Sequence, residues 1–191
     1  KGQVVAGFDQ LNYDITGVDF AKKIIDEIKE FDSKLKVHYG DLRKLKFEDN
    51  YFTTYLSFGV IEHFNKKKDV SDIINEAKRV TSNQLFFSVP YYSPKLKEIV
   101  DELNESKEKT DNFFQYYFDI NQLEKFFNTY DLKIKSIEYY ATYIGLKRHS
   151  KIFKALNNIY IFRLFLSRMK QILNSIFGKK YAHMIGVWVT K

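Results

Sequence analysis

Two aspartates at the ends of short strand-like segments are the side chains of this sequence best placed to hold a ligand. Asp19 closes the segment 13–19, and Asp41 follows the segment 35–38 in a Gly-Asp-Leu sequence. A carboxylate after a strand can accept two hydrogen bonds from the vicinal hydroxyls of a ribose, as we expect for Asp19. Asp41 can accept from an exocyclic adenine amine while Leu42 flanks the purine. Asp19 can equally cap the next helix, and the Gly-Asp pair can equally be an ordinary turn.

The stretch from Ser57 to Phe64 is a second place where chemistry can occur, and its sequence is SFGVIEHF. Gly59 allows the backbone to approach a ligand closely. His63 can act as a general base for a hydroxyl acceptor, because an imidazole titrates near neutral pH. The alternative is that Glu62 and His63 brace the turn after the preceding strand.

A dense aromatic run occupies residues 113–118, with the sequence FFQYYF. It can roof an apolar acceptor pocket in which the hydroxyls of Tyr116 and Tyr117 orient the substrate. Packing in the core is an equally good explanation for so many aromatic side chains. We therefore keep both interpretations for the two tyrosines.

The composition excludes several classes of site. The chain has no cysteine, which excludes disulfides, thiolate zinc sites and a cysteine nucleophile, and which permits a cytoplasmic location. The four histidines are scattered without a metal-ligand spacing, so we predict no metal. Neither a transmembrane run of about 18 apolar residues nor a signal peptide is evident.

Strand-like and helix-like segments alternate along the first half, which predicts a parallel sheet with helical crossovers. With 191 residues and 45% apolar composition, the chain suits one globular domain over 1–191. The predicted helices span 3–11, 21–31, 70–80, 95–107, 121–129 and 152–177, the last in one or two pieces. The predicted strands span 13–19, 35–38, 52–58, 84–89, 132–143 and 182–190, the last two as an antiparallel pair.

Charge is distributed unevenly along the chain. The net charge is +7, Glu138 is the last acidic residue, and ten basic residues follow it. We interpret residues 147–180 as a basic helical insertion before the last strand. Such asymmetry favours an anionic partner, a phospholipid surface or a phosphorylated substrate rather than nucleic acid, although a solvated basic face is also compatible.

The helix predicted within this insertion is amphipathic, with Gly178 as its C-terminal cap. Its apolar side chains recur at helical spacing, at Phe162, Phe165, Leu166, Met169, Ile172, Leu173 and Ile176. A basic amphipathic helix can lie on an anionic membrane, here through 159–177. It can also cover a pocket, pair with a second subunit, or pack on the sheet.

The order of these pieces resembles the class I S-adenosylmethionine-dependent methyltransferases, in the small-molecule group that includes the quinone-biosynthesis-like enzymes. The resemblance covers most of 2–145 and 181–191, where 83–90 is similar to the family's fifth strand and 182–191 to its closing seventh strand. It implies a Rossmann-like, doubly wound, mostly parallel sheet with an antiparallel final strand. The family's first strand and glycine-rich loop are expected to be largely missing from this chain.

The resemblance also implies a cofactor, S-adenosylmethionine, and a reaction, in-line methyl transfer to a small-molecule or lipid-linked acceptor. His63 is the candidate base for an oxygen acceptor. The implied cofactor-binding residues are Asp19 for the ribose, Phe20, Asp41 and Leu42 for the adenine, and Ser57, Phe58 and Gly59 along the methionine part.

Two other functions fit the same pattern. One is a non-catalytic cofactor-binding or scaffold protein on this fold, associated with membranes. The other is a nucleotide-linked oxidoreductase, because an acidic residue at the end of the second strand also suits a dinucleotide ribose. The closing pair of long strands favours methyl transfer over both.

Overall fold

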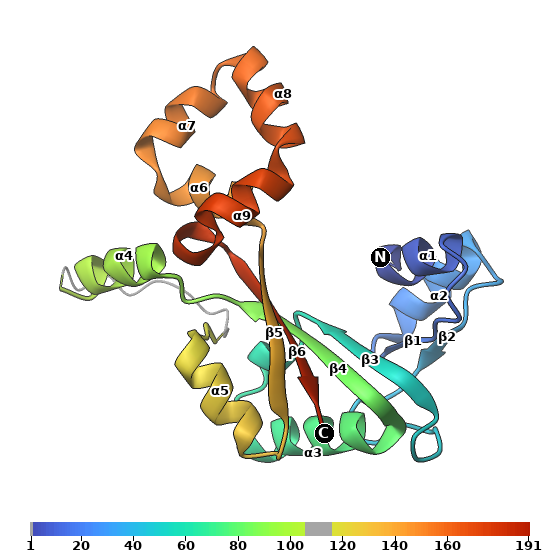
Figure 1. Cartoon of the computed structure of the whole chain (residues 1–191). Coiled ribbons are helices and arrows are strands. Elements are labelled where there is room, and N and C mark those ends of the chain that lie inside the picture. Colours follow the sequence, from blue (N-terminus) through green and yellow to red (C-terminus); the bar gives the residue numbers. More distant parts are fainter. Residues whose placement is uncertain (1, 106–115) are drawn as a thin grey trace. The chain divides into compact units, whose positions relative to one another are not determined.

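A computed structural model describes residues 2–105 and 116–191 (Figure 1). The chain forms two compact units, the first from residues 1–52 and 68–82 and the second from 53–67 and 83–191. Each unit has its own sheet, a two-stranded one in the first and a four-stranded one in the second. The prediction of a single domain stays a prediction.

The first unit is built around a parallel pair of strands, β1 (Gly17–Asp19) and β2 (Val37–Tyr39). Parallel neighbours need a crossover, which α2 (Lys22–Phe31) provides. α1 (Gln3–Gln10) precedes β1. The core consists of Ile25, Ile28, Leu35 and Val37, with Val5, Ala6 and Ile24 packed against it. Apolar residues at helical spacing on α2 thus form the face that the helix buries.

Helix α3 (Lys67–Val80) fixes the loop that follows β2. Arg79 donates to the carbonyl oxygens of Phe47 and Leu45 at 2.8 and 3.2 Å, and to the carboxylate of Glu76 at 2.7 Å. Glu76 in turn accepts from the backbone N–H of Leu45 at 2.7 Å. The hydrogen bonds from Arg79 lower the pKa of Glu76. This network holds the segment just beyond Asp41 in place.

The four-stranded sheet of the second unit has the order β3-β4-β6-β5. Its strands are β3 (Phe52–Phe58), β4 (Thr81–Pro90), β5 (Lys133–Tyr140) and β6 (Met184–Thr190). β6 runs antiparallel to both β4 and β5, which confirms the predicted α/β fold with an antiparallel final strand. Two helices precede β5, α4 (Pro94–Glu105) and α5 (Ile120–Asn128).

The core of the second unit lies on this sheet. Every residue of β4 from Leu85 to Pro90 is buried, as expected of a strand covered on both faces. α5 contributes Leu123 and Phe127, which are 0% exposed, and the ring centroids of Phe87 and Phe127 lie 5.2 Å apart. The short near-continuous apolar run of β4 is thus a buried strand, as the sequence predicts.

The predicted strand over 132–143 is too long at its C-terminal end. β5 ends at Tyr140 because Ala141 adopts a left-handed conformation with φ 56°, which an extended chain cannot accommodate. Thr142 then begins α6 (Thr142–His149), a helix that the sequence pattern does not reveal. The side chain of Asn174 accepts a hydrogen bond from the backbone N–H of Thr142 at 3.2 Å.

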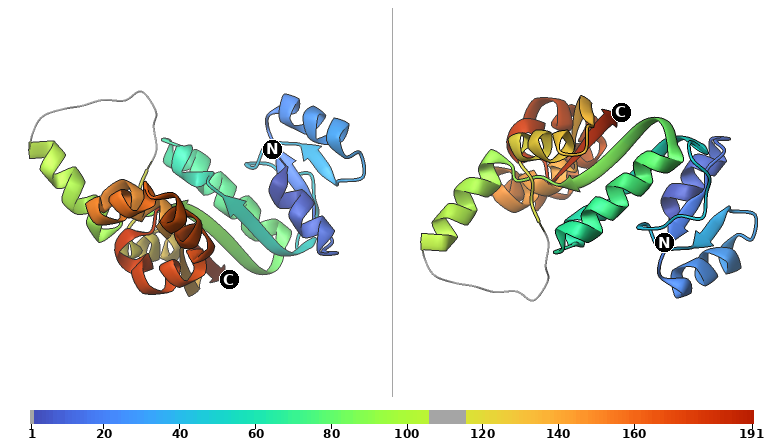
Figure 2. Two further views of the ribbon diagram at one scale, coloured as in Figure 1. Left: turned by 90° about the horizontal axis from the view of Figure 1, so that it is seen from above. Right: turned by 90° about the horizontal axis from the view of Figure 1, so that it is seen from below.

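Residues 152–177 are divided among three helices, so the prediction of one or two helical pieces is wrong. After α6 come α7 (Lys151–Asn157), α8 (Tyr160–Arg168) and α9 (Lys170–Tyr181). These helices, coloured orange to red, stay together in all views (Figures 1 and 2). Their small core consists of Leu146, Phe153 and Leu173.

Gly178 lies inside α9 and does not cap the helix as predicted. A Cβ at this position would lie 2.7 Å from Cβ of Tyr139, so glycine is needed where α9 crosses β5. Gly145 of α6 is in the same situation, because a Cβ there would overlap the carbonyl oxygen of Tyr181. Two close backbone approaches therefore hold the helices of the insertion against one another and against β5.

We expect Gly145→Ala to lower the free energy of unfolding by about 1–3 kcal/mol, because the added methyl group forces α6 and α9 apart. The matched control is Gly7→Ala in α1, where a Cβ meets nothing within 4 Å. Alanine there should be neutral or stabilise by about 0.5–1 kcal/mol, as usual in a helix. Urea unfolding of both variants measures the difference, and equal stabilities would contradict the proposed close approach.

Candidate functional site

Asp19 and Asp41 lie at the same end of the β1–β2 pair. β1 and β2 are parallel, and Asp19 is in register with Tyr39. The backbone N–H of Gly40 donates to the carbonyl oxygen of Asp19 at 3.0 Å, which brings the chain after β2 beside the end of β1. In open α/β sheets this carboxyl end of the strands is where ligands bind. The structure therefore brings the two predicted aspartates together.

One of the two carboxylate oxygens of Asp19 is hydrogen-bonded within the protein. Its Oδ1 accepts from the backbone N–H of Ala21 at 2.8 Å, so it supports the first turn of α2, although the N-cap residue is Ala21. In the part of the chain that the structure describes, its Oδ2 has no hydrogen-bond partner. The next residue, Phe20, is 75% exposed. A half-buried carboxylate with one oxygen not used by the described residues is thus followed directly by an exposed aromatic ring.

Asp41 is held by a neighbouring arginine. The guanidinium of Arg43 donates from Nε at 3.0 Å to Oδ1 and from Nη2 at 2.8 Å to Oδ2, and its Nη1 reaches Asp69 at 2.9 Å. These hydrogen bonds lower the pKa of Asp41. The pair is exposed, at 44% for Arg43 and 50% for Asp41. A ligand amine therefore has to compete with Arg43 for Asp41, a feature that the sequence analysis did not predict.

The second unit contains the other predicted residues, beginning at the end of β3. Ser57 is buried and Phe58 is partly exposed. Gly59 has φ 65°, in the left-handed region, and its N–H donates to the carbonyl oxygen of Ser88 at 3.0 Å. A Cβ on Gly59 would lie 3.3 Å from Oε1 of Glu62. Both the backbone conformation and the close carboxylate favour glycine at this turn.

Glu62 is the most unusual polar residue near this strand end. It lies on the short 3₁₀ helix η1 (Ile61–His63), and its side chain is 2% exposed. Its Oε2 has no hydrogen-bond partner among the residues that the structure describes. Burial raises the pKa of Glu62, while its own backbone N–H and His63 act in the opposite direction. The sequence interpretation of Glu62 as a simple turn brace missed this buried carboxyl, because burial cannot be read from the local pattern.

His63 lies beside this carboxyl but at the surface. Its Nε2 is 3.8 Å from Oε1 of Glu62, and its side chain is 40% exposed. An exposed imidazole can meet a solute, and the buried carboxyl lies directly next to it. The arrangement can therefore support proton transfer at the end of β3.

The segment 116–118 is tied by its backbone to the ends of η1 and β4. The N–H of Tyr116 donates to the carbonyl oxygen of Glu62 at 3.1 Å, and the N–H of Phe118 to that of Pro90 at 3.0 Å. Tyr116 and Tyr117 are 46% and 39% exposed, so neither side chain is buried in the core. The first three residues of the aromatic run, 113–115, lie outside the described residues.

Tyr140 of β5 approaches the same group of residues from the sheet. Its hydroxyl is hydrogen-bonded to the side chain of Ser88, which is buried in β4. Burial raises the pKa of Tyr140, and the nearby charges of Glu62 and Glu138 add to this. The phenol therefore stays neutral beside Glu62.

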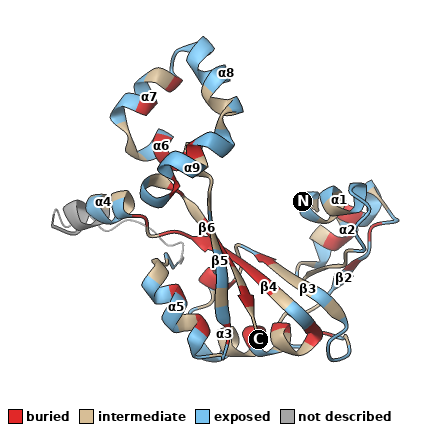
Figure 3. Ribbon diagram, viewed as in Figure 1, coloured by how far each residue is buried: buried red, intermediate tan, exposed pale blue. Residues whose placement is uncertain are grey.

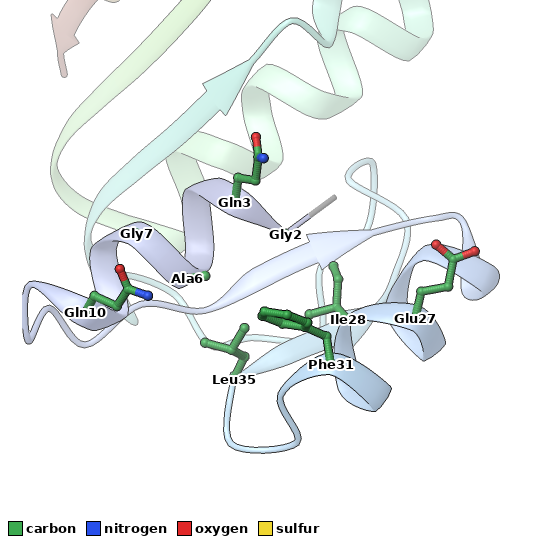
Figure 4. Close-up of a pocket in the computed structure, with 9 residues that line it drawn as sticks. All are labelled: Gly2, Gln3, Ala6, Gly7, Gln10, Glu27, Ile28, Phe31 and Leu35. Carbon is green, nitrogen blue, oxygen red and sulfur yellow. The ribbon is translucent and has the colours of Figure 1, made fainter.

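A hollow of about 500 Å³ lies elsewhere in the first unit, between α1 and α2 (Figure 4). Its wall includes Gln3, Gln10, Ile28 and Phe31, and none of the residues predicted to bind a ligand lines it. Among the described residues, no group of three or more histidine, aspartate or glutamate side chains could hold a metal ion. The strand ends thus remain the best candidate site.

Comparisons with known proteins find one matching family model and several solved structures with a similar fold. Residues 1–88 match the methyltransferase domain family. No curated protein matches the sequence. Among solved structures, a SAM-dependent methyltransferase from Archaeoglobus fulgidus is similar at a TM-score of 0.58 and 14% identity, over 100% of this chain and 81% of the other.

Two further solved structures are similar. Magnesium protoporphyrin IX methyltransferase from Synechocystis PCC 6803, with bound SAH, has a TM-score of 0.54 and 11% identity, over 92% of this chain and 63% of the other. The PH0226 protein from Pyrococcus horikoshii OT3 has a TM-score of 0.52 and 22% identity, over 72% of this chain and 73% of the other. At such low identities these likenesses concern the fold.

The raised pKa of Glu62 has a consequence for stability. Above its ordinary value of 4.5, the folded protein keeps a proton on Glu62 that the unfolded chain releases. Its contribution to the free energy of unfolding therefore falls as pH rises from the ordinary towards the raised pKa. Glu62→Gln should lack this fall, so the variant gains stability relative to the wild type between acid and neutral pH.

Urea unfolding across this pH range measures the difference between the two proteins. The control is Glu124→Gln on the exposed face of α5, which should follow the wild type at every pH. A constant difference between Glu62→Gln and the wild type would show that Glu62 titrates normally in the folded state.

Proposed function

We propose that the chain is a class I S-adenosylmethionine-dependent methyltransferase and that it transfers a methyl group to a small, lipid-linked acceptor at an anionic membrane surface. The match of residues 1–88 to the methyltransferase domain family supports the predicted family and cofactor, and it favours methyl transfer over the oxidoreductase and scaffold alternatives. The quinone-biosynthesis-like subgroup stays a prediction. The observation that supports the acceptor class is the exposed apolar and basic surface of α7–α9.

The strand ends of the first unit fit the adenosine part of the cofactor. Asp19 has an oxygen available for the ribose hydroxyls, and exposed Phe20 can cover one side of the adenine. Asp41 and Leu42 contact the other side of the adenine. Arg43 then either leaves Asp41 or stays beside the adenine ring. Carboxylates accept strong hydrogen bonds from hydroxyls and amines, which suits both roles.

The strand end of the second unit fits the reacting part. Ser57, Phe58 and the left-handed Gly59 offer backbone to the methionine moiety. Tyr116 and Tyr117, which are partly exposed, contact the acceptor. S-adenosylmethionine supplies the methyl group on a sulfonium, a good leaving group. The chain's task is to align the acceptor and exclude water, and His63 takes the proton of a hydroxyl acceptor.

Asp19→Ala should weaken binding of S-adenosylhomocysteine roughly tenfold to a hundredfold, because a hydrogen bond to a charged group is worth about 1.5–3 kcal/mol. Calorimetry measures the affinity, and circular dichroism checks the fold. The control is Asp14→Ala, which removes an exposed carboxylate paired with Lys36 in the segment before β1 and should leave the affinity unchanged. Equal affinities of Asp19→Ala and the wild type would remove Asp19 from the site.

The surface of α7–α9 exposes many large apolar side chains. All nine residues of α8 are described, and none of them is buried (Figure 3). The exposed apolar residues of this surface are Ile152, Ile159, Tyr160, Ile161, Phe162, Leu164, Phe165, Ile172, Ile176 and Phe177, with exposures from 41% to 77%. Contiguous apolar surface of this kind marks a site that meets a partner or a membrane.

The charge of this surface selects an anionic partner. No acidic residue follows Glu138, and the exposed apolar residues are interleaved with Lys151, Lys154, Arg163 and Arg168. Basic side chains beside exposed aromatic residues are typical of helices that lie in the interface of anionic lipid. Among the described helices, none is long and apolar enough to cross a membrane. Contact through 159–177 would bring the enzyme to an acceptor anchored in the lipid.

The protein should float with vesicles of phosphatidylcholine and phosphatidylglycerol, but not with phosphatidylcholine alone, and salt should weaken binding. The double variant Phe162→Ser and Phe165→Ser should lose binding without unfolding, because both side chains are exposed, at 46% and 57%. The control is Phe31→Ser on α2, whose side chain is 84% exposed and which should bind like the wild type. Equal flotation of the wild type with the two kinds of vesicle would contradict the membrane contact. So would equal flotation of the double variant and the Phe31→Ser control.

A further inference from the structure

Across residues 2–105 and 116–191, one oxygen of the buried Glu62 carboxyl finds no hydrogen-bond partner. A carboxylate removed from water is costly unless it is paired or hydrogen-bonded, and Oε2 has no hydrogen-bond partner among the described residues. The other oxygen, Oε1, lies 3.8 Å from Nε2 of His63. Buried groups that carry such a cost are often found at functional sites.

The groups that face Glu62 come from three segments. On its own element, His63 is adjacent. From β5, Tyr140 lies close enough to sense the charge of Glu62, but its hydroxyl is hydrogen-bonded to Ser88. From the segment after residue 115, Tyr116 contributes its backbone N–H to the carbonyl oxygen of Glu62 and not to the carboxylate. Within the described residues, His63 is therefore the cation-forming side chain that the carboxylate meets.

We propose that Glu62 is a positioning residue that stabilises the protonated ring of His63, so that His63 can hold the proton released by a hydroxyl acceptor. The inference rests on the proposed role of His63 as the base. In the balanced step, the O–H bond of the acceptor breaks and its proton moves to His63. The acceptor oxygen forms a bond to the methyl carbon, while the S–CH₃ bond breaks and its electron pair stays on sulfur.

The pairing has a clear physical logic. Before the reaction, the carboxylate of Glu62 is buried with one oxygen unpartnered among the described residues, which is costly. When His63 takes up a proton, the two groups become an ion pair, and the attraction at 3.8 Å is strong because one partner is almost fully removed from water. The exposed ring remains reachable from solution, whereas the carboxyl behind it is not. Glu62 thus acts through His63 and does not itself touch the acceptor.

The experiment is an NMR titration of the histidine rings in the whole protein, which needs no acceptor. In the wild type, the signal of His63 should titrate in two steps, because it senses the ionisation of Glu62 as well as its own. In Glu62→Gln, the His63 curve should become a single step with its midpoint lower by about 1 pH unit, the effect of removing one opposite charge. His38, His149 and His183 are internal controls whose curves should not change, and Glu124→Gln is the matched variant control.

The possible results separate the inference from the proposed function. A single-step His63 curve in the wild type, or the same midpoint in Glu62→Gln, overturns the role of Glu62. The wild-type curve gives this answer even if Glu62→Gln does not fold. Absence of S-adenosylhomocysteine binding in calorimetry would instead overturn the proposed function, and the coupling of Glu62 to His63 would stand or fall on the titration alone.

Discussion

Parallel pairing of neighbouring strands is the constraint on which the candidate cofactor site depends. β1 and β2 run in the same direction, so the residues that follow them emerge at the same end of the pair. The register places Asp19 opposite Tyr39, two residues before Asp41, and a slip of one residue would turn Val37 out of the core. The apolar core and the position of the two carboxylates are thus set by the same hydrogen bonds.

Two features of the second unit are costly for folding alone. One is the carboxyl of Glu62, which is buried and has one oxygen without a hydrogen-bond partner in the described part of the chain. The other is α8, whose large apolar side chains face water. In the proposals above, the first cost is offset when His63 takes up a proton during the reaction, and the second when α8 meets a lipid surface. Features that local stability does not explain are therefore the ones on which the functional proposals rest.

Glycines connect the insertion to the sheet in a way that periodicity does not reveal. Gly145 and Gly178 lie inside helices, where glycine is normally unfavourable. Each removes a side chain that would collide with residues of another element, Tyr181 and Tyr139 respectively. The local sequence pattern makes Gly178 look like the end of a helix, because a glycine at a helix cap is recognised from its neighbours along the chain. A glycine at a close crossing is required by residues that are distant in sequence.

The sequence by itself determined the elements whose apolar residues recur at a regular spacing. β3 matches its prediction at both ends, α2 and β4 lie where their patterns indicate, and the two aspartates follow the predicted strands. Local patterns suffice there because a helix or strand buries a face whose spacing is written in consecutive residues. The order of these elements was also enough to indicate the family.

Tertiary structure alone decided how the polar side chains are paired and buried. Arg43 binds its near neighbour Asp41 and, at the same time, Asp69 of α3, which is 26 residues further along the chain. Glu62 loses its water because segments more than 25 residues away, in β4, β5 and after residue 115, surround the end of β3. Desolvation and charge pairing depend on neighbours distant along the chain, so residue types and spacing can propose a carboxylate but cannot say whether it is free, paired or buried.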